Sequence, residues 1–113
     1  MAQASLLQGT LDLLILRTLA AAPLHGVGIA DRIKLVTGGA FDVKAGSLFP
    51  ALYRLEGEGW IVGAWGETPE GRRAKIYRIT KDGRAQLAEE KKSWARVALA
   101  IQQVLEMPYG VRR

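Results

Sequence analysis

Basic side chains gather in one short stretch of the chain. Residues 70–84 hold six basic and two acidic side chains, and so carry four of the five net positive charges of the 113 residues. The basic members are Arg72, Arg73, Lys75, Arg78, Lys81 and Arg84. Lys and Arg neutralise phosphate groups, so a cluster of this kind indicates contact with a nucleic-acid backbone. A solvated charged loop would have the same composition.

A second stretch, residues 44–59, has the spacing of a short helix with two unlike sides. Leu48, Leu52 and Leu55 recur at i, i+4 and i+7, which predicts one buried side. Ser47 is the expected N-cap, because its hydroxyl can accept a backbone N–H of the first turn. An ordinary amphipathic helix with a solvated outer side would show the same pattern.

The other side of this helix has the residue types of a nucleic-acid reader. Phe49, Pro50 and Tyr53 share that side, and Arg54 lies beside them. Such side chains can contact base edges and phosphates when a helix lies in the major groove. With Ser47 as the cap, Pro50 falls in the first turn, where a missing N–H costs little.

The residue types offer little for catalysis. The chain has one histidine, His25, and no cysteine, which excludes thiol nucleophiles and disulfides. A helix cap or a phosphate contact is the expected role of His25. No carboxylate pairs with a histidine at metal-ligand spacing, and residues 57–59 lack the third glycine of a dinucleotide fingerprint. We therefore expect no enzyme, no metal site and no cofactor.

The elements that must position these residues follow from the periodicity. Three helices come first, then two strands joined by a Pro- and Gly-containing turn, then one long helix. The expected ranges are 5–21, 25–37, 47–56, 60–67, 75–80 and 81–107. Ile29, Ile33 and Val36 form the expected buried row of the second helix. This order predicts an α+β fold, mainly α: a winged helix-turn-helix whose hairpin is the wing.

The last helix carries a broad apolar stripe that must be buried somewhere. A partner subunit is the expected cover, which makes this a long C-terminal dimerisation helix, although packing back on the first helix is the alternative. Trp94 either packs in this interface or lines a shared cavity and stacks on a flat ligand. The expected interface and effector residues are Leu11, Trp94, Val97, Ala98, Ile101, Val104 and Leu105.

Length and composition fit one compact domain with an extended helix. Nearly half of the residues are apolar, so a core can form. We expect a DNA-binding domain at 1–80, the dimerisation helix at 81–107 and a tail at 108–113. The most apolar run, 6–22, contains Asp12 and Arg17, so no membrane span is expected. No basic residue precedes Arg17, so the run lacks the basic region of a secretory signal, and none is expected. The cytoplasm is the expected location, and a net charge of +5 suits either a polyanion or simple solubility.

Four stretches together resemble the PadR family of bacterial transcriptional regulators, in its short subfamily with a single C-terminal helix. They are LQGTLDLLILR (7–17), PLHG (23–26), GSLFPALYRLE (46–56), and WGE with GRRAKIYRIT between 65 and 80. The resemblance implies a homodimer that binds an inverted-repeat operator, usually to repress, and that a small aromatic effector releases. It also implies that Trp94 matches a tryptophan that faces a central pore in multidrug-binding members.

The same resemblance assigns DNA contacts by position. They would be His25, Lys44, Ser47, Phe49, Pro50, Tyr53, Arg54, Arg72, Arg73 and Lys75. Phe49 stands where the family often has a tyrosine, so it lacks a phosphate donor and is expected to pack instead. Two other functions fit the residues: a winged-helix protein-interaction module without specific DNA binding, and a small-molecule carrier built around Trp94.

Overall fold

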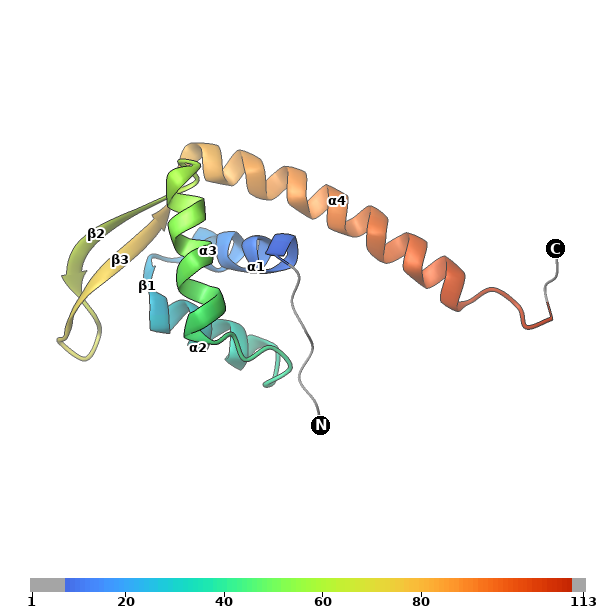
Figure 1. The fold of residues 1–113 in the computed structure, drawn as a ribbon, viewed down its shortest axis with the longest axis horizontal. Helices are drawn as coiled ribbons and strands as arrows, with labels where there is room; N and C mark the ends of the chain where they lie inside the picture. The colour runs from blue at the N-terminus through green and yellow to red at the C-terminus, as the bar shows by residue number, and fades with distance from the viewer. Residues whose placement is uncertain (1–7, 111–113) are drawn as a thin grey trace.

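The computed structural model describes residues 8–110, so residues 1–7 and 111–113, including Leu7, lie outside it. Four helices and a small antiparallel sheet make a mostly helical fold (Figure 1). The elements are α1 (Gln8–Ala21), β1 (Leu24–His25), α2 (Gly26–Val36), α3 (Ala45–Gly57), β2 (Ile61–Glu67), β3 (Arg73–Ile79) and α4 (Lys81–Leu105). This order confirms the predicted winged helix-turn-helix, with the β2–β3 hairpin as the wing.

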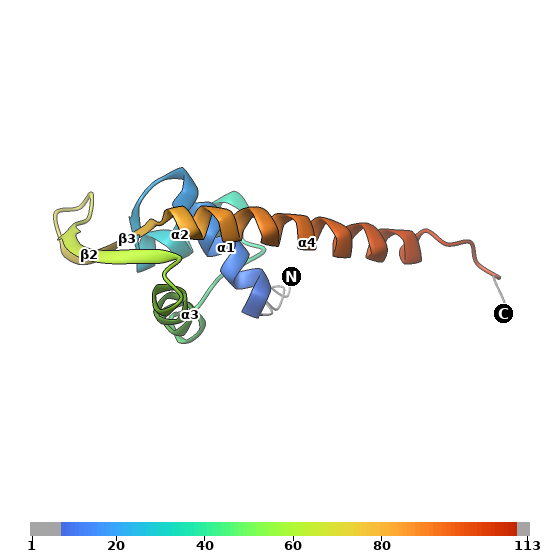
Figure 2. The same cartoon turned by 90° about the horizontal axis from the view of Figure 1, so that it is seen from above.

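Helix α1 is the centre of the core, and it contacts α2, α3, α4 and β3 (Figure 2). Ile15 and Leu16 are fully buried, as expected for a helix that is apolar nearly all round. The predicted buried side of α3 is confirmed, because its three leucines are at most 2% exposed. These are Leu48, Leu52 and Leu55.

The sheet has three strands in the order β1-β3-β2, all antiparallel. The wing pairs from Ile61 with Ile79 to Glu67 with Arg73, so the hairpin prediction is confirmed. The connection after α1 is more than a turn, because Leu24 pairs with Tyr77 as part of β1. A two-residue strand has no periodicity of its own, and only its partner β3 reveals it.

The start of α3 was predicted wrongly. Lys44, not Ser47, is the N-cap, and the backbone N–H groups of Ser47 and Leu48 donate to its carbonyl at 3.0 and 2.9 Å. Pro50 is therefore the sixth helical residue and not an early one. Its missing N–H leaves the Gly46 carbonyl without the usual donor four residues on, a cost within the helix.

Helix α2 follows its prediction except at its end. Ile29 and Ile33 are buried, but Val36 is 75% exposed. Val36 is the last residue of the helix and lies at the rim of a shallow hollow between α1 and α2. The apolar spacing of α2 therefore extends about one turn beyond the part of the helix that the core covers.

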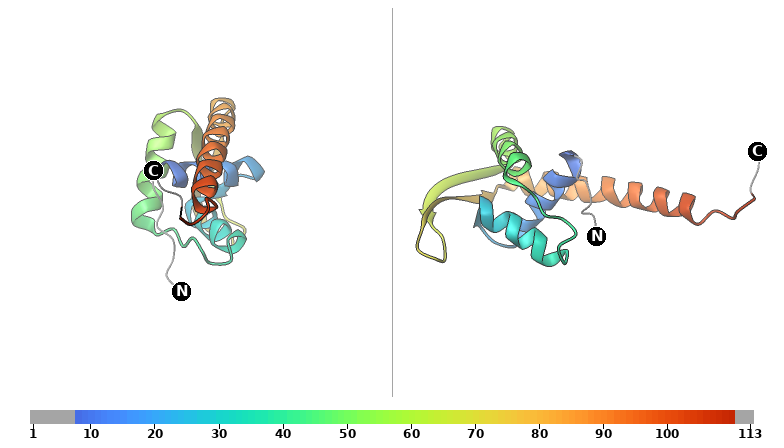
Figure 3. Two further views of the ribbon diagram at one scale, coloured as in Figure 1. Left: turned by 90° about the vertical axis from the view of Figure 1, so that its right-hand side faces the viewer. Right: turned by 60° about the horizontal axis from the view of Figure 1, so that its bottom comes forward.

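Helix α4 is attached to the domain at its first turns and then projects away from it (Figures 1 and 3). Thr80 caps it as predicted, since its hydroxyl accepts the Gly83 N–H at 3.0 Å. A Cβ on Gly83 would lie 2.0 Å from the Trp60 carbonyl oxygen, so only glycine permits this attachment. Gly83 and Leu87 are the buried residues of α4, and the stripe beyond them is uncovered by its own domain.

Among residues 8–110, no helix is both long and apolar enough to span a membrane. The same residues contain no group of three or more His, Cys, Asp or Glu side chains arranged to hold a metal ion.

Candidate nucleic-acid interface

The outer side of α3 is open to solvent. Tyr53 is 82% exposed and Phe49 is 45% exposed, whereas the leucines of the same helix are buried. Lys44, Ser47 and Pro50 are also exposed. The helix therefore presents one aromatic-rich side outward and anchors itself by the other, which is the arrangement needed to read a groove.

Phe49 combines packing with exposure. A Cβ on Gly26, the first residue of α2, would lie 2.7 Å from Cε1 of the Phe49 ring. The ring edge thus occupies the space that a side chain on Gly26 would need, and α2 and α3 approach closely there. This contact agrees with the packing role expected for Phe49.

Arg54 does not point freely outward. Its guanidinium donates a hydrogen bond to Oδ1 of Asp12 in α1 and forms an ion pair with it. Asp12 is 7% exposed, and this burial raises the pKa of its carboxyl above the usual value, while the charge and hydrogen bond of Arg54 act in the opposite direction. The structure therefore ties this predicted DNA contact to α1.

The turn of the wing is closed by Thr68. Its backbone N–H donates to the Arg72 carbonyl at 2.8 Å, and its side-chain oxygen accepts the Arg72 N–H at 3.1 Å. Gly71 takes a φ of +82°, a conformation that glycine adopts at little cost. These bonds fix the direction in which the chain enters β3, and with it the positions of Arg72 and Arg73.

The three predicted wing contacts are not equivalent. Arg72 and Arg73 are exposed, and the Arg73 guanidinium carbon lies 5.1 Å from the centroid of the Trp65 ring. Lys75 instead donates from Nζ to Oε1 of Glu56 in α3 at 3.0 Å. This hydrogen bond raises the pKa of the Lys75 ammonium above its usual value. Lys75 is thus already engaged within the chain.

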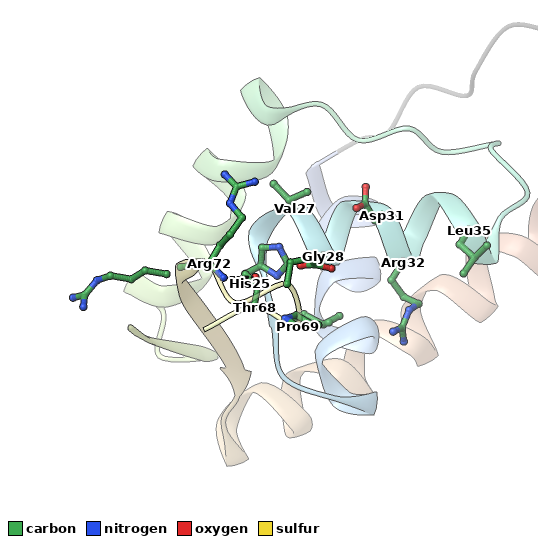
Figure 4. Close-up of a pocket in the computed structure, with 13 residues that line it drawn as sticks. His25, Val27, Gly28, Asp31, Arg32, Leu35, Thr68, Pro69 and Arg72 are labelled. Carbon is green, nitrogen blue, oxygen red and sulfur yellow. Dashed lines mark hydrogen bonds between the residues drawn. The ribbon is translucent and has the colours of Figure 1, made fainter. Parts of the chain in front are cut away.

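A cleft of about 550 Å³ separates α2 from the wing turn (Figure 4). His25 lines it at the N-cap of α2, but its side chain makes no capping hydrogen bond, so the predicted cap is absent. A Cβ on Gly28 would lie 3.0 Å from the His25 ring, which places the ring against the first turn of α2. Arg72 faces it from the wing (Figure 4).

The predicted interface residues divide into two groups. Leu11 is 5% exposed and belongs to the core of its own chain, so it offers little surface to a partner. Ala98 is half-buried, whereas the other residues of the stripe are more than half exposed. A hollow of about 510 Å³ lies between α1 and α4. Its lining is Gly9, Thr10, Leu13, Glu90, Ser93, Trp94, Val97 and Ile101.

Sequence reasoning missed both ion pairs of α3. Asp12 is separated from Arg54 by 42 residues, and Glu56 from Lys75 by 19, so no local pattern joins them. One signal was available: Asp12 is the single acidic residue within the apolar run 6–22. A charge at such a position is rarely buried without a partner.

Comparison with known proteins identifies the family. The family model described as the transcriptional regulator PadR-like family matches residues 15–89. The chain belongs to this family. The match runs from α1 into α4 and includes α2, α3 and the wing. Members are transcriptional regulators rather than enzymes, and PadR regulators bind DNA.

The relatives cover most of the chain. A protein of Lysinibacillus sphaericus called uncharacterized protein X is 33% identical over 94% of this chain and 97% of its own. The transcriptional regulator Rv3488 of Mycobacterium tuberculosis is 31% identical over 74% and 75%. The solved PadR-like regulator of Bacillus cereus is 30% identical with a TM-score of 0.77, covering 89% and 96%. A Streptococcus mutans structure, smu.1704, is 26% identical in sequence, with a TM-score of 0.81, and the match covers 99% of both chains.

Proposed function

We propose that this regulator is a homodimer that binds a specific DNA sequence and represses transcription until a small molecule releases it. The observation that carries the proposal is the open side of α3, where Tyr53 is 82% exposed, together with the exposed arginines of the adjoining wing. Such a regulator would act in the cytoplasm, where the DNA of a bacterial cell lies.

Residues 47–56 would enter the major groove. Tyr53, at 82%, is more exposed than Phe49 at 45%, and Ser47 and Pro50 lie on the same open side. A hydroxyl beside an aromatic ring can contact both a base edge and a thymine methyl group. Phe49 would contribute contact area while it holds α3 against Gly26.

Arg72 and Arg73 would hold the flanking phosphates. Both are exposed at the wing turn, and the turn is fixed by the hydrogen bonds of Thr68. His25 would add a contact at a helix N-terminus, where backbone N–H groups and the helix dipole favour an anion. Lys44 lies at the N-terminus of α3, but its Nζ donates to Oδ2 of Asp42 at 2.7 Å, which supports a weaker contact. The engagement of Lys75 with Glu56 supports a weaker contact there.

The dimer would form through α4. Val97, Ile101, Val104 and Leu105 are each at least 54% exposed on one side of a helix that projects from its domain. An exposed apolar stripe of this size is typical of a protein–protein interface. A two-fold dimer would also place two reading helices on an inverted repeat. Residues 1–80 would then be the DNA-binding domain, 81–107 the dimerisation helix and 108–113 a tail.

An effector would bind beside Trp94. The hollow between α1 and α4 has mainly apolar walls, and Trp94 is 54% exposed there. A small aromatic molecule could stack on the indole. Because α1 also contacts α3, a ligand that moved α1 relative to α4 would also shift α3, the reading helix.

The test is fluorescence anisotropy with labelled DNA from upstream of the protein's own gene and a shuffled duplex, each at low and moderate salt. Tight binding of the first duplex that salt weakens would support the proposal. Equal weak binding to both would point to an operator elsewhere. No binding at either salt would favour the second function, a protein-interaction module that uses the same fold.

A further inference from the structure

The C-terminal half of α3 is tied to α1 by the pair of Asp12 and Arg54. The Asp12 side chain is 10% exposed and the Arg54 side chain 34%, so most of this contact is shielded from water. Arg54 directly follows Tyr53, the exposed residue of the reading side. The pair with Asp12 therefore anchors the turn of α3 that also carries Tyr53.

This pair is better suited to fixing geometry than to stabilising the fold. Removing two charges from water is costly, and burial is the largest influence on the pKa of Asp12, which it raises despite the nearby guanidinium. A hydrophobic pair of similar volume often stabilises a protein equally well. A hydrogen-bonded ion pair, however, allows fewer relative orientations of two helices than apolar side chains do.

A second ion pair holds the same turn from the other side. Glu56 of α3 accepts a hydrogen bond from Lys75 of β3 at 3.0 Å, two residues after Arg54. The last turn of α3 is thus linked to α1 through Arg54 and to the wing through Glu56. The Glu56 pair is more exposed, with 27% and 37% of the two side chains accessible, and is the weaker link.

We infer that Arg54 is a positioning residue: its ion pair with Asp12 sets the angle of α3 on α1, and through that angle the discrimination between DNA sequences. This inference rests on the proposed function and adds the residue pair that holds the reading helix.

The experiment compares Asp12→Ala, Arg54→Ala and the double variant. For each, affinity is measured for a duplex selected by the wild type from a random pool and for a shuffled duplex. We expect each single variant to lower the ratio of the two affinities by about tenfold, and the double variant to lower it no further, since residues of one network are not additive. Affinity for the shuffled duplex should stay within about twofold, because phosphate contacts dominate it.

An unchanged ratio for Asp12→Ala beside a lowered ratio for Arg54→Ala would overturn the inference, because Arg54 would then act without its partner. A double variant whose loss is the product of the single losses would overturn it too. Glu56→Gln is the matched control: it removes the negative charge of the more exposed pair on the same turn, and we expect a smaller change in the ratio.

Two further measurements cover other failures. If Asp12→Ala does not fold, Asp12→Leu with Arg54→Met replaces the pair by apolar side chains; a preserved fold with a lowered ratio supports the inference, and a preserved ratio overturns it. If the wild type does not discriminate between duplexes, the proposed function fails. Amide exchange without DNA then tests the structural part, by comparing Asp12→Ala with the wild type. Exchange that speeds up more in residues 51–57 than in residues 81–90 supports the inference. An equal change in both segments overturns it.

Discussion

The wing makes a quantitative prediction about salt. If Arg72 and Arg73 each neutralise one phosphate, a dimer gains four contacts from them. Each contact contributes about 0.9 to the slope of log affinity against log salt concentration. Replacing both arginines by alanine should therefore lower the slope by about 3.6. Between about 50 and about 200 mM salt, the wild type should lose about 150-fold more affinity than the variant does.

The structure also predicts how unequal the wing residues are. Lys75 is hydrogen-bonded to Glu56, so Lys75→Ala should lower the slope by less than about 0.9 per subunit. Arg73→Ala also removes the stacking on Trp65, and thermal unfolding should confirm that the variant is folded before its slope is interpreted.

The assay is anisotropy of a labelled duplex at five or more salt concentrations. The matched control is Lys92→Ala with Arg96→Ala, which removes the same charge from the side of α4 opposite Trp94, because those positions lie about 200° around the helix from it. An unchanged slope for the wing variant would remove the wing from the interface. Equal changes in both variants would show a general effect of net charge, not phosphate contact.

Four further outcomes test other parts of the structure. Tyr53→Ala should reduce the affinity ratio between a selected and a shuffled duplex by about 5- to 150-fold, and equal losses on both would argue against a reading role. Gly26→Ala should lower the free energy of unfolding by about 1–3 kcal/mol, because the Phe49 ring must shift, and urea unfolding checks this. Ile101→Glu should turn a dimer into a monomer with the domain still folded, as sedimentation would show. Burial raises the pKa of Asp12 in the folded protein above its unfolded value of 3.8. Its contribution to the free energy of unfolding should therefore be greatest below pH 3.8 and should decline as the pH rises through the folded pKa. Urea unfolding of Asp12→Asn over the same pH range should show no such decline.

Local sequence determined the elements and much of the site. The spacing of Leu48, Leu52 and Leu55 predicted the buried side of α3. Tyr53 lies on the opposite side and is therefore exposed. Thr80 predicted the start of α4, because its hydroxyl can accept the N–H of Gly83, three residues later. These features depend on neighbours within one or two turns, and therefore a sequence pattern is enough to find them.

Charge and composition also placed the wing correctly. Residues 67–73 combine proline, glycine and charge, and the structure puts the hairpin turn there, with Gly71 at positive φ. The local signal failed at Ser47: its side chain suits an N-cap, but α3 is capped three residues earlier, at Lys44.

Tertiary structure alone decided which polar side chains are free. Arg54 and Lys75 look like Arg72 and Arg73 in the sequence, yet the first two are paired with Asp12 and Glu56 from distant elements. Leu11 and Val104 are both apolar helix residues, but the packing of α1 in the core buries Leu11 while Val104 remains 62% exposed on the projecting part of α4. Burial and pairing depend on which segments meet in space, and residues far apart in the chain carry no local trace of that meeting.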